Sequence, residues 1–218
     1  MVAAIVVLNW AYQVLRKPSE LLASVGSAKT PAQTWREYET FFRKYSTPVI
    51  TPELLAALAQ VEAAGNPVAT TPWRLRVAAD PRKVYRPASS SVGLFQMTDG
   101  TFAEAKRYCV REHAVREDCW FSALYTRVLP RHAVELTSAY LDRRVAAIVE
   151  RRRVAPTLAQ KQELAAVIHL CGASAGEMYA ARGFRLMPGQ RCGDHDPRAY
   201  VARVATMKRL FARLKALG

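Results

Sequence analysis

A glutamate on the apolar face of a predicted helix is the side chain of this sequence best suited to acid–base chemistry. The stretch Thr51–Pro67 reads TPELLAALAQVEAAGNP, in which Thr51 can cap a helix and Pro52 suits its first turn. Leucines and a valine recur at helical spacing, and Glu62 falls on the same face in the last turn. Apolar surroundings and the negative end of the helix dipole both disfavour a carboxylate there. We therefore predict a raised pKa for Glu62 and a neutral acid that donates a proton.

The alternative interpretation is that the Glu62 carboxylate reaches water or pairs with an arginine. A second segment of the sequence bears on the choice between these interpretations. Ser89–Phe102 reads SSSVGLFQMTDGTF. The succession of E-x-x-G-N-P and S-x-x-V-G-L-F-Q-M-T resembles the lytic transglycosylases of the lysozyme superfamily, which carry an SLT-type domain. In that family a catalytic glutamate ends a helix, and a G-L-M-Q-[IV]-T segment lines the sugar groove beside it. The resemblance covers Thr51–Ala105 well and the C-terminal third of the chain loosely.

The resemblance implies a mainly α-helical, lysozyme-like fold in which a long loop or small β-hairpin forms one wall of the cleft. It also implies a peptidoglycan lytic transglycosylase that needs neither a metal nor an organic cofactor. Glu62 would be the single acid and base at the bond between N-acetylmuramic acid and N-acetylglucosamine, and the product would be a 1,6-anhydro end. Ordinary glycosidases use two carboxylates, roughly 5–5.5 Å or 6.5–9.5 Å apart. Only Glu62 stands out here, which suits substrate-assisted cleavage.

The resemblance further implies which residues line the sugar groove. A glycine permits close approach of the backbone, a glutamine amide exchanges hydrogen bonds with hydroxyl or N-acetyl groups, and aromatic faces stack on sugar rings. The predicted substrate-binding residues of the two segments that form the cleft are Ser91, Gly93, Leu94, Phe95, Gln96, Thr98, Trp73 and Tyr85. An alternative for Trp73 and Tyr85 is that both rings pack inward from an ordinary loop.

A histidine stands where the family has a tyrosine. The family's A-Y-N-A-G-P-G motif lines up with Ala165–Gly172, so that His169 takes the place of a tyrosine near the catalytic glutamate. We predict that His169 hydrogen-bonds Glu62 or substrate, the alternative being a histidine satisfied within the core. Tyr179 is a second candidate for the missing tyrosine's role. Downstream, Tyr200–Val204 matches a Y-V-x-x-V pattern of the family and supplies part of an apolar helical stripe.

Several predicted helices must hold these residues in place. An aromatic-faced helix follows Thr30, and a long helix with a cationic end follows Pro130. Thr157 opens a third helix through a capping box with the glutamine three residues later, and we expect the same arrangement for Thr101 and Glu104. An apolar stripe predicts a final helix after an Asp-Pro pair near the C-terminus.

Composition limits the class of protein. A chain of 218 residues with half its residues apolar is long enough for one domain, or for one domain with an N-terminal appendage. The net charge of +14 attracts nucleic acid, anionic lipid, or the carboxylates and phosphates of a cell wall. No zinc spacing, RNA-binding aromatic signature or clear helix-turn-helix pattern occurs, and the charge is spread along the chain. We expect peptidoglycan glycan strands, and no nucleic acid, as the partner.

The cysteines indicate the redox compartment. Four occur, Cys109, Cys119, Cys171 and Cys192, and none forms a C-x-x-C pair. Two local pairs predict disulfides 109–119 and 171–192 in an exported or periplasmic protein. The alternative is four free thiols in a cytosolic one. A neighbouring Asp194–His195 pair is a weak metal signal that we interpret as a turn and helix cap, and we predict no metal site.

The N-terminal segment permits three interpretations. Met1–Leu15 is apolar but has no basic residue before its hydrophobic run, and it is shorter than an ordinary membrane span of about 20 residues. It is a remnant of an export signal, a short anchor giving membrane association through residues 1–15, or a helix docked on the body. We expect residues 1–29 to form this segment and a linker, and residues 30–218 the catalytic domain.

Three rival functions are compatible with the sequence. A hydrolytic muramidase would use Asp99 or another carboxylate to position water. A catalytically silent peptidoglycan-binding protein would retain the groove without the chemistry, which the histidine at position 169 leaves open. A basic nucleic-acid binder would show binding that weakens steeply with salt.

Overall fold

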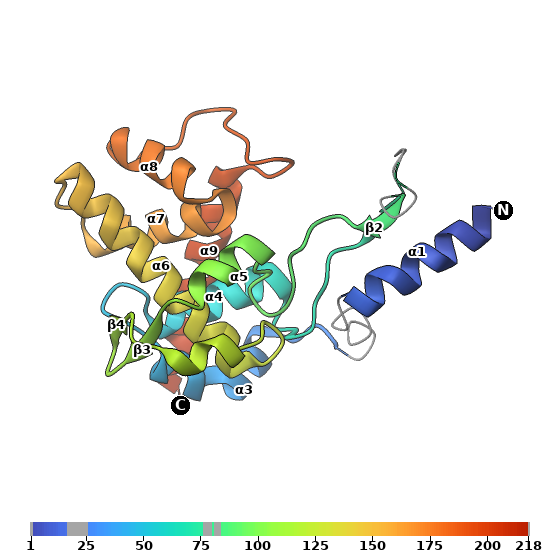
Figure 1. The fold of residues 1–218 in the computed structure, drawn as a ribbon. Coiled ribbons are helices and arrows are strands. Elements are labelled where there is room, and N and C mark those ends of the chain that lie inside the picture. Colours follow the sequence, from blue (N-terminus) through green and yellow to red (C-terminus); the bar gives the residue numbers. More distant parts are fainter. Residues whose placement is uncertain (1, 17–25, 76–79, 81–83, 218) are drawn as a thin grey trace.

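The computed structural model describes residues 2–16, 26–75, 80 and 84–217, and it is mainly helical (Figure 1). The helices are α1 (Val2–Arg16), α3 (Pro31–Lys44), α4 (Pro52–Ala63), α5 (Asp99–Ala105), α6 (Pro130–Arg152), α7 (Leu158–Cys171), α8 (Ala173–Ala181), α9 (Pro197–Leu217) and the 3-10 helix η2 (Trp120–Leu124). Strands β1 (Trp73–Leu75) and β2 (Tyr85–Pro87) form one antiparallel hairpin, and β3 (Cys109–Arg111) and β4 (Ala114–Arg116) form another. The predicted helical fold with a small hairpin is confirmed.

Helix α4 lies at the centre of the body. Its residues Leu54–Ala59 are all buried, and Thr51 caps its first turn by accepting a hydrogen bond from a backbone N–H, as predicted. The most extensive packing of α4 is with α9. Lys215 near the end of α9 pairs with Glu53 at the start of α4, at 2.6 Å, so the two helices run antiparallel. The start of α9 therefore lies beside the end of α4, where Glu62 stands.

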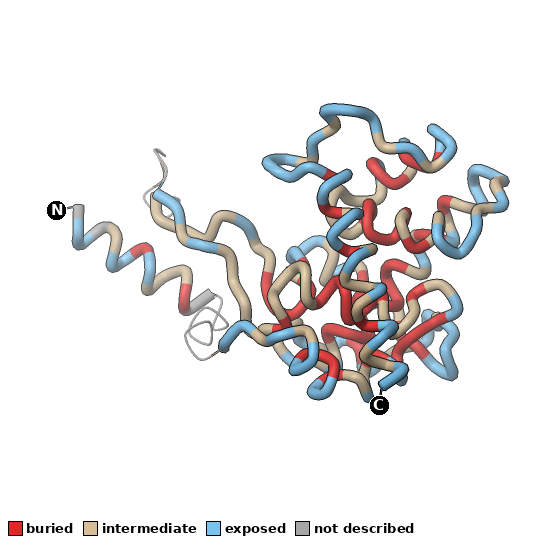
Figure 2. Tube along the Cα trace, turned by 180° about the vertical axis from the view of Figure 1, so that it is seen from behind, coloured by how far each residue is buried: buried red, intermediate tan, exposed pale blue. Residues whose placement is uncertain are grey.

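The aromatic face of α3 and the middle of α6 complete the core (Figure 2). Trp35, Tyr38 and Phe42 of α3 are buried, and the ring centroid of Trp35 lies 5.8 Å from that of Phe211 on α9. Aromatic side chains of this size contribute a large share of the apolar area that folding removes from water. The core thus fixes α4 against α3 and α9 and leaves little freedom for its last turn.

Two predicted helix starts had different outcomes. Thr157 and Gln160 form the predicted capping box at the start of α7. The expected box of Thr101 and Glu104 is wrong, because Thr98 is the cap and α5 begins at Asp99. The Thr98 side chain accepts a hydrogen bond from the Thr101 backbone N–H, so Thr101 lies within the first turn instead of before it.

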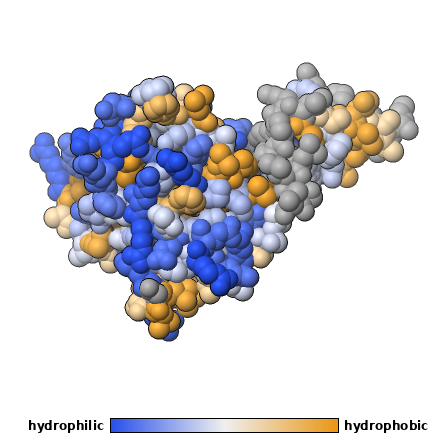
Figure 3. Space-filling model, turned by 90° about the horizontal axis from the view of Figure 1, so that it is seen from below, coloured by the Kyte–Doolittle hydropathy of each residue, from blue (hydrophilic) through white to orange (hydrophobic). Residues whose placement is uncertain are grey.

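The first hairpin and α1 form an arm beside the body (Figure 1). Helix α1 packs along β2 of this hairpin. Its outer side exposes Val7, Leu8 and Trp10, and Figure 3 shows apolar side chains on this arm next to a largely hydrophilic body. Within the described ranges, no helix combines the length and the apolar character that crossing a membrane requires.

Both predicted disulfides are present. Cys109 and Cys119 join across the β3–β4 hairpin, with 5.8 Å between their Cα atoms. Cys171, the last residue of α7, joins Cys192 in the loop before α9, with a Cα–Cα distance of 5.4 Å. The second disulfide thus ties two elements that approach the end of α4.

Candidate active site

Glu62 occupies a nearly enclosed position at the end of α4. Its side chain is 16% exposed, and that of the neighbouring His169 is 10% exposed. The helix ends one residue later, at Ala63, and its C-cap residue Ala64 adopts a left-handed conformation. The carboxyl is therefore presented at the C-terminal edge of a rigid, buried helix and retains a narrow opening to solvent.

Two side chains from two other helices meet the same carboxyl oxygen. The Tyr200 hydroxyl of α9 donates a hydrogen bond to Oε1 of Glu62. Nε2 of His169, on α7, lies 3.4 Å from that same Oε1. Contacts within the described part of the chain leave Oε2 without such a partner. The carboxyl is thus held by one oxygen and presents the other.

The predicted raised pKa of Glu62 is wrong for the free protein. Burial does raise the pKa of this carboxyl, as expected. The hydrogen bond and positive charge of His169, the Tyr200 hydroxyl and the charge of His195 lower it by more, so the pKa lies below its ordinary value. Burial and the negative charge of Glu62 in turn raise the pKa of Tyr200 well above its usual range. Tyr200 is accordingly a neutral donor to an ionised carboxylate.

The loop before α9 brings a second histidine into the electrostatic field of Glu62. Cys192 and His195 form a two-residue backbone bridge, with N–H to O distances of 2.9 and 3.1 Å. Asp196 then caps α9 by accepting hydrogen bonds from the N–H groups of Arg198 and Ala199. The Asp194–His195 pair therefore belongs to a turn that leads into the helix carrying Tyr200.

The segment from Ser91 to Thr98 is held by hydrogen bonds to Ala69, in the loop that follows α4. Gly93 N–H donates to the Ala69 carbonyl at 2.8 Å, and the Gln96 side-chain NH₂ donates to the same carbonyl at 2.9 Å and to the Gly93 carbonyl at 3.0 Å. Gln96 has a positive φ of 45°, a conformation that these two hydrogen bonds help to hold. Its amide nitrogen is thereby occupied, whereas its amide oxygen has no partner among the residues that the structure describes.

Three predicted substrate contacts in this segment need correction. Leu94 and Phe95 are 0% and 1% exposed and belong to the core, so their side chains anchor the segment instead of lining a groove. At Gly93, with φ +85°, an added Cβ would lie 2.2 Å from the main-chain oxygen of Arg127. The close approach that requires glycine here is to the protein backbone and not to a sugar. Ser91 is half-buried and Thr98 exposed, and Thr98 caps α5.

The predicted aromatic residues of the cleft wall lie on the β1–β2 hairpin. The rings of Trp73 and Tyr85 have centroids 5.0 Å apart and pack against each other. Both side chains are half-buried, and the hairpin extends along α1 (Figure 1). Their contact with substrate stays a prediction.

Tyr179 does not substitute for the family's tyrosine beside Glu62. Its hydroxyl donates to Oε2 of Glu163 at 2.8 Å, and the ring is buried against Phe184. Tyr200, which the sequence pattern assigned to packing, is the tyrosine that reaches Glu62. The match of Tyr200–Val204 to a family pattern was the signal that could have identified it. No sequence pattern indicated that His195 acts electrostatically on Glu62, because this effect depends on where the disulfide-linked loop places His195.

Asp99, the candidate of a hydrolytic mechanism, is paired elsewhere. One of its carboxyl oxygens accepts a hydrogen bond from Arg127 at 2.7 Å. Arg127 also donates to the main-chain oxygens of Ser90 and Met97. This arginine therefore ties Asp99 to the base of the 91–98 segment, where the carboxylate has a structural partner.

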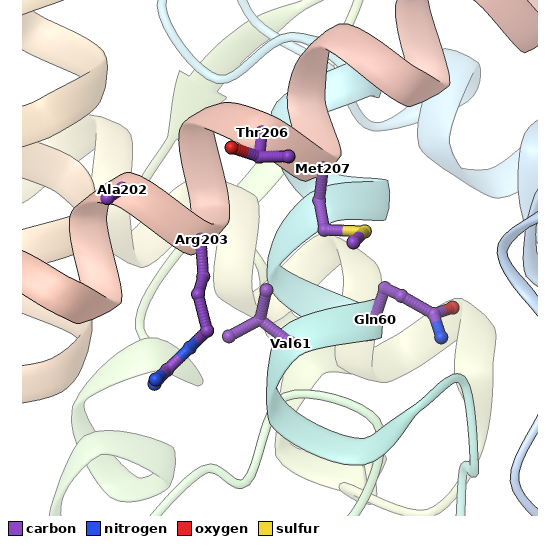
Figure 4. A pocket seen from close by; sticks show the side chains of 6 residues that line it. All are labelled: Gln60, Val61, Ala202, Arg203, Thr206 and Met207. Carbon is purple, nitrogen blue, oxygen red and sulfur yellow. The ribbon is translucent and has the colours of Figure 1, made fainter.

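A cavity of about 420 Å³ opens between α4 and α9 but does not contain the acid. Figure 4 shows Arg203 and Met207 extending from α9 towards Val61 on α4. The guanidinium of Arg203 also lies 6.0 Å from the ring centroid of Tyr200. Among the residues that the structure describes, no carboxyl lines this cavity, and Glu62 directly follows the lining residue Val61 in the chain.

A family comparison covers the part of the chain that carries Glu62. A family model described as Transglycosylase SLT domain matches residues 39–159. The matched range includes Glu62 and the 91–98 segment, and it ends before His169 and Tyr200. A comparison with curated proteins found no match.

Proposed function

Because the chain belongs to the Transglycosylase SLT domain family, whose members act on peptidoglycan, we propose that it is a lytic transglycosylase with Glu62 as its single acid and base. The scissile bond is the β-1,4 bond between N-acetylmuramic acid and N-acetylglucosamine. The observation that carries the assignment is the enclosed Glu62 carboxyl, which Tyr200 and His169 hold through Oε1 while Oε2 has no partner among the described residues. Oε2 is the oxygen that faces the glycosidic oxygen.

His169 supplies the proton that Glu62 lacks in the free protein. While water reaches this pair, the pKa of Glu62 is lowered by its contacts with His169 and Tyr200. A glycan in the groove excludes that water, which destabilises two charges more than two neutral groups. The proton then moves from Nε2 of His169 to the Glu62 carboxyl, and the pair becomes neutral without any change in its total number of protons.

Cleavage then follows in two steps. Glu62 protonates the glycosidic oxygen, and the C1–O bond breaks while the substrate's own N-acetyl group stabilises the developing cation at C1. The Glu62 carboxylate next accepts the proton of the muramoyl 6-hydroxyl, whose oxygen bonds to C1. Glu62 is thereby protonated again, and the product is a 1,6-anhydro end. Tyr200 holds the carboxyl throughout, and the Gln96 amide oxygen and Ser91 are the polar groups proposed to face the glycan.

The two disulfides and the wall substrate support an exported or periplasmic location for this enzyme. The exposed apolar side of α1 supports membrane association of the N-terminal segment as a separate proposal.

Digestion of purified sacculi by the wild type and Glu62→Gln tests the mechanism. The amide keeps the size of the side chain but removes the acid, and general acid–base catalysis typically contributes about 10²–10⁴-fold. We expect muropeptide release to fall by at least about 10³-fold while binding to sacculi persists. Glu150→Gln is the control, because Glu150 is exposed on α6 and distant in the chain from the cluster.

Product mass decides between the two enzymatic mechanisms. An anhydro end is lighter than a hydrolysed end by one water, so a hydrolysed product would support the muramidase alternative. Equal release by the wild type and Glu62→Gln would refute this site. Binding of sacculi without release by the wild type would support a silent peptidoglycan-binding protein.

A further inference from the structure

A cavity of about 520 Å³ lies behind the Cys171–Cys192 disulfide, at the end of α7. The disulfide, Leu170 and Ala175 supply its apolar surface, and the exposed Met178 lies at its side. Its walls come from the end of α7, from α8 and from the loop before α9. These are the elements that carry or adjoin the two histidines near Glu62.

The charged and amide side chains that line this cavity are hydrogen-bond donors. Arg182 and Arg191 line it together with Gln190, and among the described residues no carboxylate does. The guanidinium of Arg191 is oriented by a hydrogen bond to the main-chain oxygen of Asp194 at 2.7 Å. The Gln190 amide oxygen accepts a hydrogen bond from the Met187 N–H, so the NH₂ group of the same amide is directed away from that N–H. In the described part of the chain neither arginine has an acidic partner within ion-pair distance. A concave site with an apolar base and donor groups around it is suited to a carboxylate-bearing ligand.

The position of the cavity identifies which carboxylates could reach it. Leu170 and Cys171 directly follow His169, whose ring lies 3.4 Å from Glu62. In peptidoglycan the muramoyl residue at the scissile bond carries a peptide stem with D-glutamate and terminal carboxylates. An extended peptide advances at most about 3.3–3.6 Å per residue, so three to five residues span roughly 10–18 Å. A stem of this length is long enough to reach from a glycan bound at Glu62 to the end of α7.

We propose that the cavity behind the Cys171–Cys192 disulfide binds the acidic peptide stem of the substrate through Arg182 and Arg191. This inference rests on the proposed function, and it makes the enzyme selective for glycan that still carries its peptides. The apolar base receives the methyl groups of the alanines, and the guanidinium groups receive the carboxylates.

Titration of the whole protein with the synthetic tripeptide L-Ala-γ-D-Glu-diaminopimelate, followed by calorimetry, tests the site without any cleavage. We expect the wild type to bind this peptide, and the double variant Arg182→Gln/Arg191→Gln to bind it at least about tenfold more weakly. Arg152→Gln/Arg213→Gln is the matched control, because it removes the same charge from two exposed arginines of α6 and α9. A tripeptide with amidated carboxylates should bind neither protein.

Cleavage of two substrates then separates this inference from the proposed function. With peptide-bearing glycan strands we expect the Arg182/Arg191 variant to lose about tenfold in kcat/KM, and with amidase-stripped strands to match the wild type. Equal losses on both substrates, or tripeptide binding unchanged in this variant, would overturn the inference. Failure of the wild type to cleave either substrate would instead contradict the proposed function, and the titration would still decide the peptide site.

Discussion

At the scale of single residues, Glu62 combines two properties that seem opposed. An acid catalyst needs a proton, yet the pKa of this carboxyl lies below its ordinary value in the free protein. Tyr200 and His169 both contact Oε1 of Glu62. In our proposal, His169 transfers a proton to this carboxyl when the substrate binds. The histidine at the family's tyrosine position is therefore a proton partner in our proposal.

Removal of the Tyr200 hydroxyl tests how the carboxyl is held. A hydrogen bond to a charged group is worth about 1.5–3 kcal/mol, so Tyr200→Phe should lower kcat by roughly 10–100-fold. The measurement is the initial rate of muropeptide release from sacculi. Tyr125→Phe is the control, since Tyr125 makes a comparable hydrogen bond to the buried Glu135 at 2.8 Å. A rate for Tyr200→Phe equal to that of the control would rule out the positioning role.

The pKa of Glu62 also predicts how stability depends on pH. Burial raises this pKa, but His169, Tyr200 and His195 lower it below the ordinary value of 4.5. The folded state thus binds this proton less readily than the unfolded state, and the stabilisation is fully present above about pH 4.5 and lost as the pH falls through the folded value. We expect the Tm difference between wild type and Glu62→Gln to shrink as the pH falls below about 4.5. A difference that grows towards acid pH would mean that the folded-state pKa is raised.

At the scale of elements, the site depends on the alignment of three helices. Helix α4 is fixed by the core, but α7 and the start of α9 each contribute one partner of Oε1. The Cys171–Cys192 disulfide joins the end of α7 to the loop that leads into α9. The second disulfide, Cys109–Cys119, closes a hairpin on another part of the chain. The two crosslinks should therefore differ in their effect on catalysis.

Replacement of each cysteine pair by serine measures that difference. The loops of 21 and 10 residues predict a stability loss of about 3 kcal/mol for either disulfide. Of the two disulfides, only Cys171–Cys192 joins the elements of His169 and Tyr200, which also pack directly against each other. We expect its serine variant to be at least about tenfold less active than the Cys109–Cys119 variant, assayed where both remain folded by circular dichroism. Equal activities would show that packing alone aligns the site.

At the scale of the whole molecule, the net charge of +14 makes binding to an anionic wall an electrostatic process. Such long-range attraction is screened by salt, whereas the buried contacts of the site are not. The charge thus acts on association with the substrate and not on the fold or the chemistry.

Co-sedimentation of Glu62→Gln with sacculi at increasing salt tests this role of the charge. We expect binding to weaken on the order of tenfold between about 0.05 and 0.5 M NaCl. The Glu62→Gln variant is used so that the sacculi are not digested during the measurement. Sedimentation that does not change with salt would show that uncharged contacts dominate binding.

The sequence by itself determined the local elements and indicated Glu62 as the candidate acid. Thr51 and Pro52 define the start of α4, the leucine spacing defines its buried face, and Glu62 follows from that face. The spacing of the cysteines also identified both disulfides. These predictions succeeded because caps, helical periodicity and short loop closures depend on residues close together in the chain.

Only the tertiary structure decided the surroundings of that acid. Tyr200 lies 138 residues from Glu62 in the chain, and its hydroxyl reaches Oε1 because α9 packs antiparallel to α4. The sequence predicts Leu94 and Phe95 as groove residues, but both belong to the core. Which side of an irregular segment is buried depends on the elements that pack against it. The pKa of Glu62 is likewise lowered, although the sequence predicts that it is raised. Burial can be inferred from a stripe of apolar residues. The charges and the hydroxyl that face the carboxyl come from elements distant in the chain.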